Sequence, residues 1–169
     1  YLVSIQDFND APTIDNIQNM IVSEDGSVNS IGEVNLQSVL LSGISGGIGE
    51  SSQYTRVTAT TTNANLITQL SVNFSDGAPE GTVTFVPGAD LSGQAVIDVT
   101  VRDTGLDGVF DTADDGMTST SFTVTVTAIN DAPTLLVETP ILNLDENAGL
   151  QTISLDGISA GGNESQIGR

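Results

Sequence analysis

Five aspartates lie close together in one short stretch of the chain and form its densest chemical feature. The stretch reads RDTGLDGVFDTADDG and holds Asp103, Asp107, Asp111, Asp114 and Asp115. So many carboxylates repel one another at neutral pH, and a Ca²⁺ ion removes that cost because it accepts six to eight oxygen ligands in flexible geometry. The interspersed glycines let the backbone bend so that successive oxygens converge. We therefore interpret the stretch as a Ca²⁺-binding loop, with a solvated loop of turn-favouring residues as the alternative.

Two Asn-Asp-Ala-Pro segments are the second candidate for binding a cation. The proline fixes its own φ and keeps the residue before it extended, which makes each segment a short, stiff linker. Oxygens beside such a linker can bridge two modules through a cation, whereas simple turn chemistry at a strand end is the alternative. Glu24, with Asp25 beside it, is a weaker candidate partner from the strand that follows the first linker. The candidate linker ligands are Asp7, Asn9, Asp10, Asn130 and Asp131.

Composition excludes several classes of function. The chain has 169 residues, a net charge of −19, and no Cys, His or Trp. Disulfides, thiolate or imidazole metal sites and Ser–His or Cys nucleophiles are therefore impossible. The acidic charge repels nucleic acid and anionic lipid, and it favours hard cations. Paired carboxylates can hydrolyse glycosides, but these lie in loops and linkers without a tryptophan platform, so we expect no enzyme.

Alternating apolar and polar residues between turn signals predict an all-β protein, a Greek-key β-sandwich. We expect the five-aspartate loop to join two long strands, and therefore to have its ends held close together. The core is expected to be mostly β-branched, with Phe74, Phe85, Phe110 and Phe122 as larger anchors. The expected strands are Asn19–Val22, Gln37–Leu41, Arg56–Thr61, Ile67–Asn73, Thr82–Val86, Ala95–Arg102 and Ser119–Ile129.

The sequence repeats itself. YLVSIQDFNDAPT (1–13) aligns with FTVTVTAINDAPT (122–134), and GISGGIGESSQ (43–53) aligns with GISAGGNESQ (157–166). The repeat is roughly 115–120 residues long, the size of one β-sandwich. We therefore predict the last strand and linker of a preceding module at 1–12, a complete module at 13–131, and the opening strands of the next module at 132–169. That last segment is too short to bury a core alone, so we expect a continuing polypeptide or another chain to complete it.

The repeat resembles the cadherin-like tandem repeats of large bacterial surface proteins, including VCBS-type and RTX-adhesin repeats. The resemblance is carried by SEDGSV (23–28), GTVTFVPGADLSGQAVIDVTVRDTG (81–105) and SFTVTVTAINDAPT (121–134). It implies Ca²⁺ ligands at Asp7, Asn9 and Asp10, at Glu24 and at Asp103. The second linker departs from the pattern, with Ala128 where the first has Asp7, which implies fewer or weaker ions there. The Asp107–Asp115 insertion is not a cadherin feature and is a candidate for a separate site.

The resemblance implies an extracellular, cell-surface protein whose modules form a stalk, adhesin or fibre stiffened by Ca²⁺. The partners it implies are neighbouring modules of the same or an identical chain, with no nucleic acid and no direct membrane insertion. Two other functions stay open. One is a module whose loops bind a cell-surface protein or glycan, and the other is a subunit of a self-assembling surface filament, although strand addition alone cannot supply the strands that residues 134–169 lack.

Overall fold

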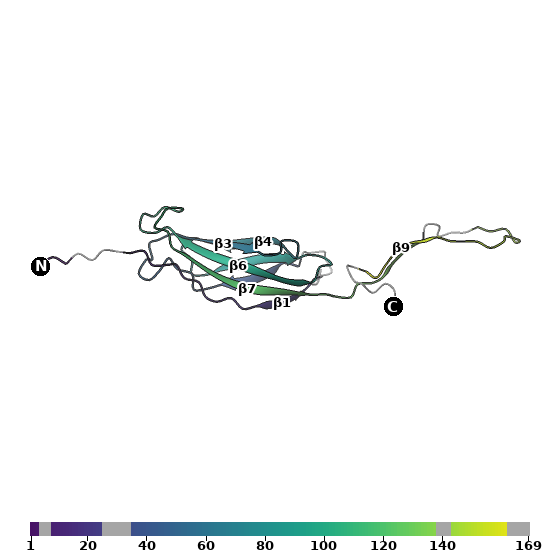
Figure 1. Ribbon diagram of the computed structural model, residues 1–169, viewed down its shortest axis with the longest axis horizontal. Coiled ribbons are helices and arrows are strands. Elements are labelled where there is room, and N and C mark those ends of the chain that lie inside the picture. Colours follow the sequence, from purple (N-terminus) through teal and green to yellow (C-terminus); the bar gives the residue numbers. More distant parts are fainter. Residues whose placement is uncertain (4–7, 25–34, 138–142, 162–169) are drawn as a thin grey trace. The chain divides into compact units, whose positions relative to one another are not determined.

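The computed structural model describes residues 1–3, 8–24, 35–137 and 143–161 of the chain. Within these residues the chain forms nine β-strands and no helix, so that part of it is all-β (Figure 1). None of the described residues forms a helix that could span a membrane. The chain divides into two compact units, Tyr1–Ala128 (unit 1) and Ile129–Arg169 (unit 2).

Unit 1 contains a four-stranded and a three-stranded sheet. In the four-stranded sheet β1 runs parallel to β7, and the other neighbours are antiparallel. The three-stranded sheet is antiparallel throughout. The first sheet has the order β1 (Met20–Ser23), β7 (Met117–Thr127), β6 (Gly93–Asp103), β3 (Thr55–Thr61). The second has the order β2 (Gln37–Leu41), β5 (Gly81–Pro87), β4 (Ile67–Phe74).

Alternation along the strands accounts for the core of unit 1. In β6, Ala95, Ile97, Val99 and Val101 are buried, while the residues between them are exposed or half-buried. Successive side chains of a strand point to opposite faces, so one face of the sheet is apolar and the other faces water. Buried residues of both sheets form a single cluster, which places the core between the two sheets. All seven strands expected from the sequence are present, and the last one ends at Thr127.

One expected core residue lies outside the core. Phe85 and Phe122 are fully buried and Phe74 packs against the core from its margin, as expected. Phe110 instead lies in the loop between β6 and β7, where the guanidinium of Arg56 stacks over its ring at 4.6 Å. The prediction for Phe110 is wrong because a cation–π contact gives an aromatic ring a favourable place at the surface.

The first linker enters unit 1 through a small hydrogen-bonded junction. Thr13 and Ser45 form an isolated antiparallel bridge. The hydroxyl of Thr13 donates to the carbonyl oxygen of Gly43 at 2.7 Å and lies 2.8 Å from the hydroxyl of Ser45. Gly43 has a φ of 67°, which a residue with a side chain rarely adopts. This junction joins the linker to the end of β2.

Unit 2 is a two-stranded antiparallel hairpin of β8 (Thr134–Val137) and β9 (Leu155–Ser159) that begins in the same way. The hydroxyl of Thr134 donates to the carbonyl oxygen of Gly157 at 2.8 Å and lies 2.8 Å from the hydroxyl of Ser159. Gly157 has a φ of 59°. The two aligned sequence motifs therefore fold into one and the same local structure.

Candidate functional site

The five-aspartate segment, which we call the acidic loop (residues 103–116), connects two long paired strands. Arg102 at the end of β6 pairs with Met117 at the start of β7. The amide of Asp103 donates to the carbonyl oxygen of Gly116 at 3.2 Å, which closes the base of the loop. The expectation that this loop joins two long strands and has its ends held together is confirmed.

Asp103 is the centre of the base of the loop. It is 0% exposed, and one carboxylate oxygen accepts the amides of Gly105 at 3.0 Å and Gly116 at 2.6 Å. The amide nitrogen Nδ2 of Asn9 lies 3.3 Å and 3.5 Å from its two oxygens. Burying a carboxylate costs free energy unless hydrogen bonds stabilise it, and here three N–H groups lie within hydrogen-bonding distance of the Asp103 carboxylate. Asp103 therefore organises the loop and ties it to the first linker.

Asn9 joins three segments that are far apart in the sequence. Its Nδ2 also donates to the carbonyl oxygen of Asp114 at 2.9 Å. Its Oδ1 accepts a hydrogen bond from Nε2 of Gln53 at 2.7 Å. Three oxygens of Asp103 and Asp114 thus surround one nitrogen of the first linker.

Glu50 is a member of this site that the sequence prediction missed. It is buried, and both of its carboxylate oxygens accept the backbone amide of Asp10 at 3.1 Å. Gly47 lies directly against this contact, where a Cβ would meet Glu50 and the Asp10 carbonyl. A signal was present, because the second aligned motif carries a glutamate in both of its copies, GISGGIGESSQ and GISAGGNESQ.

The outer aspartates of the acidic loop accept hydrogen bonds from the loop itself. Asp114 accepts the hydroxyl of Thr112 at 2.8 Å and the amides of Leu106 at 2.9 Å and Asp107 at 3.2 Å. The bond from Thr112 contributes most to holding the pKa of Asp114 below its usual value. Desolvation raises the pKa of Asp115, but hydrogen bonds from Thr112 and two backbone amides, with the charge of Arg102, lower it further than that. The loop therefore stabilises these two carboxylates in their ionised form.

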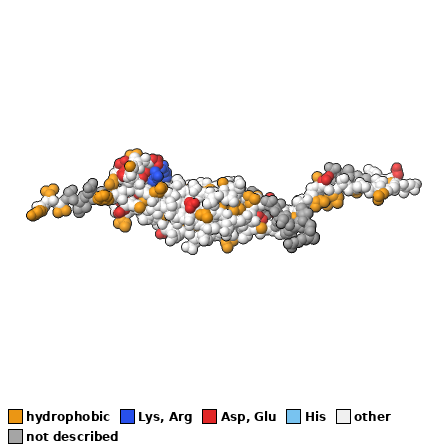
Figure 2. All heavy atoms as spheres, in the orientation of Figure 1, with side chains coloured by type: hydrophobic (Ala, Val, Ile, Leu, Met, Phe, Trp, Pro, Cys, Tyr) orange, Lys and Arg blue, Asp and Glu red, His pale blue; other side chains and the backbone are white. Residues whose placement is uncertain are grey.

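Two arginines hold the tip of the acidic loop against the sheet. Asp111 accepts hydrogen bonds from Arg56 at 2.9 Å and from Arg102 at 2.8 Å, and Arg102 also lies 3.5 Å from Asp115. In Figure 2 the basic side chains (blue) lie next to acidic side chains (red). At Asp111, two guanidinium groups therefore lie beside one predicted metal ligand.

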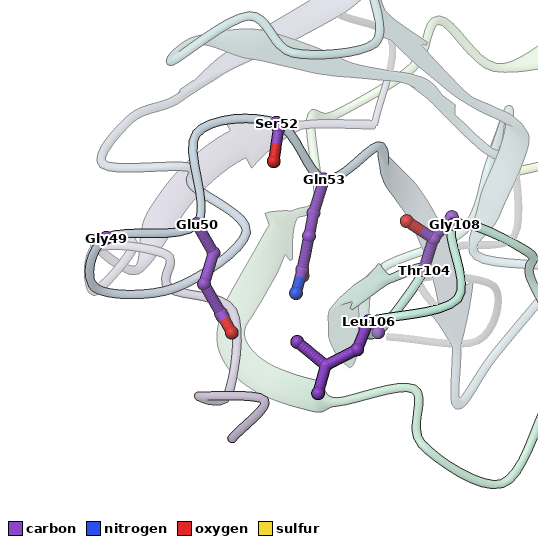
Figure 3. Close-up of a pocket in the computed structure, with 8 residues that line it drawn as sticks. Gly49, Glu50, Ser52, Gln53, Thr104, Leu106 and Gly108 are labelled. Atoms are coloured by element: carbon purple, nitrogen blue, oxygen red, sulfur yellow. The ribbon is translucent and has the colours of Figure 1, made fainter. Parts of the chain in front are cut away.

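A small pocket opens between the segment that carries Glu50 and the start of the acidic loop (Figure 3). Its volume is about 210 Å³. Ligand pockets for drug-sized molecules are commonly about 300–1,000 Å³, so this one suits at most a very small ligand. It is lined by Gly49, Glu50, Ser52, Gln53, Thr104, Gly105, Leu106 and Gly108.

The remaining predicted ligands lie apart from this site or outside the described residues. Asp7 is outside them. Glu24 is buried at the far end of the sandwich, where its amide donates to the carbonyl oxygen of Thr127 at 3.1 Å. The eleven residues of β7 separate it from the acidic loop, a distance of about 36 Å at ~3.3 Å per residue. Asn130 and Asp131 belong to unit 2, where Nδ2 of Asn130 donates to the carbonyl oxygen of Asp131 at 3.1 Å.

The structure thus brings together Asn9, Asp10, Glu50, Asp103 and Asp114 at the end of unit 1 where the first linker enters. In the part of the chain that the structure describes, no three or more Asp or Glu side chains are grouped closely enough to hold a metal by themselves. Comparison of the sequence with known protein families and with curated proteins finds no match.

Proposed function

We propose that this protein is a structural repeat protein of the cell surface, whose β-sandwich modules form an extracellular stalk, adhesin or fibre stabilised by Ca²⁺. The observation that carries the proposal is that the same hydrogen-bonded junction occurs in both units. Thr13 and Thr134 each donate to a glycine carbonyl and meet a serine hydroxyl, and the four distances lie between 2.7 and 2.8 Å. A module repeated along the chain is typical of extended repeat proteins, in which each copy contacts only its neighbours.

The sheet topology supports assigning the module to the Greek-key, cadherin-like type. The order β2–β5–β4 in one sheet and β7–β6–β3 in the other corresponds to strands B, E, D and G, F, C of an immunoglobulin-like sandwich. The parallel pairing of β1 with β7 adds a first strand to the second sheet. This arrangement agrees with the resemblance stated from the sequence.

The surroundings of Asn9 support the calcium part of the proposal. Its Nδ2 lies within 3.5 Å of both Asp103 oxygens and of the carbonyl oxygen of Asp114, so a positively polarised group already occupies a nest of oxygens. Rotation of the amide by half a turn would exchange this nitrogen for Oδ1, which is a hard-cation ligand. Asn9, Asp103 and Asp114 would hold the ion, with Glu50 and Asp10 beside them. When bound, Ca²⁺ would supply only charge neutralisation and cross-linking of the linker to the sandwich.

Calcium binding at this position would make the stability of the folded module depend on the calcium concentration. An ion that binds only the folded state at tenfold excess over its Kd adds about 1.4 kcal/mol to stability. Extracellular modules bind Ca²⁺ with a Kd of ~10⁻⁴–10⁻³ M. In calcium-poor surroundings such a site would be empty, and the first linker would be held to the sandwich only weakly. Outside the cell the bound ion would hold the linker rigidly against the sandwich.

The test is thermal unfolding of the chain in chelator, in millimolar Ca²⁺ and in Mg²⁺ at the same ionic strength. With a net charge of −19, any divalent cation stabilises the chain somewhat by screening, so Mg²⁺ is the necessary reference. We expect Ca²⁺ to raise the melting temperature above the Mg²⁺ value, and Asn9→Ala to abolish the difference. Asn73→Ala, at an exposed position of β4, is the matched control that leaves it intact. Equal melting temperatures in Ca²⁺ and Mg²⁺ would contradict the calcium proposal.

A further inference from the structure

The hairpin of unit 2 corresponds to a part of unit 1 over a longer stretch than the junction alone. QSVLLSGIS (37–45) aligns without a gap with QTISLDGIS (151–159). Leu155 therefore takes the place of Leu41, and Ile158 takes the place of Ile44. Because the glycine conformation and the threonine contacts are also shared, the alignment describes a structural equivalence.

The equivalent apolar residues have opposite environments in the two units. Leu41 is 0% and Ile44 is 4% exposed, and both belong to the core of unit 1. Leu155 is 52% and Ile158 is 60% exposed. Burying apolar side chains of this size stabilises a fold, so unit 2 forgoes a contribution that unit 1 obtains.

Unit 1 shows which strand lies beside these positions in the sheet. There β5 pairs antiparallel with β2, in the register that places Leu41 opposite Gly81. The amide of Ile44 donates to the carbonyl oxygen of Pro79 at 3.1 Å, just before β5 begins. In unit 2 the equivalent of most of β2, residues 151–154, is exposed and is not part of a strand.

We propose that unit 2 is the opening of a second sandwich and docks one occupant, a further module body of the same kind as residues 57–128. The first strand to dock would be the equivalent of β5, paired antiparallel along residues 151–155. The apolar face of β5, with Val83 and Phe85 fully buried in unit 1, then continues the apolar face of Leu155 within one sheet. The opposite sheet of the added module body covers this face, as it covers Leu41 and Ile44 in unit 1. This inference rests on the repeat in the proposed function, but it is independent of calcium.

The experiment extends the chain with a second copy of its own residues 57–128, joined after Arg169 so that Arg169 takes the place of Arg56. We expect the backbone amides of residues 151–158 to change from fast to strongly protected hydrogen exchange. We also expect a second cooperative unfolding transition, while the transition of unit 1 keeps its midpoint. If the added residues stay unfolded and residues 151–158 exchange as before, the proposal is overturned.

Two leucines of unit 2 provide a matched pair of variants. Leu155→Asp in the extended chain should abolish the second transition, because its counterpart Leu41 is in the core. Leu150→Asp should leave the second transition in place, because its counterpart Leu36 is exposed. Equal effects of the two variants would contradict the proposed register.

Experiments on the unextended chain test whether a second copy of the chain covers this face instead. We expect it to be monomeric in sedimentation and to exchange residues 151–158 quickly. If it forms a dimer in which these residues are protected, a second copy of the chain covers the face and the proposal is overturned. Calcium affects none of these outcomes, so an unchanged melting temperature in Ca²⁺ would refute the calcium site without touching this inference.

Discussion

Replacing Asp103 with alanine removes the carboxylate that accepts two backbone amides at the base of the acidic loop. The fully buried carboxylate accepts amides from Gly105 at 3.0 Å and Gly116 at 2.6 Å, and Nδ2 of Asn9 lies at 3.3 Å. After the substitution these donors face a side chain that accepts nothing. Leaving one buried donor unpaired costs about 1–3 kcal/mol, and here the amides of Gly105 and Gly116 both lose their acceptor. Asn9 keeps its bond to Asp114, so we expect a loss of about 2–6 kcal/mol from these two donors.

Urea unfolding followed by far-ultraviolet circular dichroism measures this loss as a lower midpoint with an unchanged slope. Asp98→Ala is the matched control. Asp98 lies on the same strand, is exposed, and its substitution removes the same charge from a chain of net charge −19. We expect that control to change stability by no more than about 0.5 kcal/mol.

Asp103→Asn separates the hydrogen bonds from the charge. An asparagine keeps one oxygen for the amides of Gly105 and Gly116, but it turns an NH₂ group toward Asn9. We expect it to lose about half as much stability as the alanine variant. If Asp103→Ala is as stable as Asp98→Ala, the carboxylate does not organise the loop and the reasoning from its hydrogen bonds is wrong.

Three further predictions test the packing, the ion pairs and the titration. Phe85→Ala should destabilise the chain by about 3–5 kcal/mol, as a core aromatic does, whereas Phe110→Ala should cost less than about 1.5 kcal/mol; urea unfolding compares them. Arg102→Gln should cost up to about 1 kcal/mol, and the cost should shrink in high salt because its partner at the loop tip is exposed. The lowered pKa of Asp114 gives stability that is fully present above the unfolded value of about 3.9 and is lost as pH falls through the lower folded value. Asp114→Asn should therefore flatten the fall in stability in acid titrations monitored by circular dichroism, and an unchanged acid profile would contradict the assignment.

The strands of unit 1 could be read from the sequence because each one carries its own information. A strand with one buried face must alternate, and β6 does so from Ala95 to Val101. The acidic loop was also foreseeable, since Asp and Gly residues between two long alternating segments mark a connection. Phe110 was misplaced because hydrophobicity does not distinguish a core aromatic from one that stacks under an arginine.

The candidate site was only partly predictable. Asn9 and Asp103 were identified from their types and motif positions, yet nothing local in the sequence pairs them across 94 residues. Glu50 was missed, although it recurs in both copies of its motif, because a single glutamate in a Ser- and Gly-rich loop resembles solvated surface. Asp111 was expected to face a cation, and the cations it meets are Arg56 and Arg102.

The sequence by itself determined that this protein is all-β, acidic and repetitive, because strand alternation, net charge and recurring motifs are properties of short segments and of composition. Only the tertiary structure decided which acidic groups meet. It separated Glu24 from Asp103 by the length of β7, and it placed Asn9, Glu50 and Asp103 at one end of unit 1. It also revealed that Leu41 is covered while its counterpart Leu155 is not. The physical reason is that contacts between segments follow from how strands pair and which faces they bury, and pairing of distant strands is a property of the whole fold.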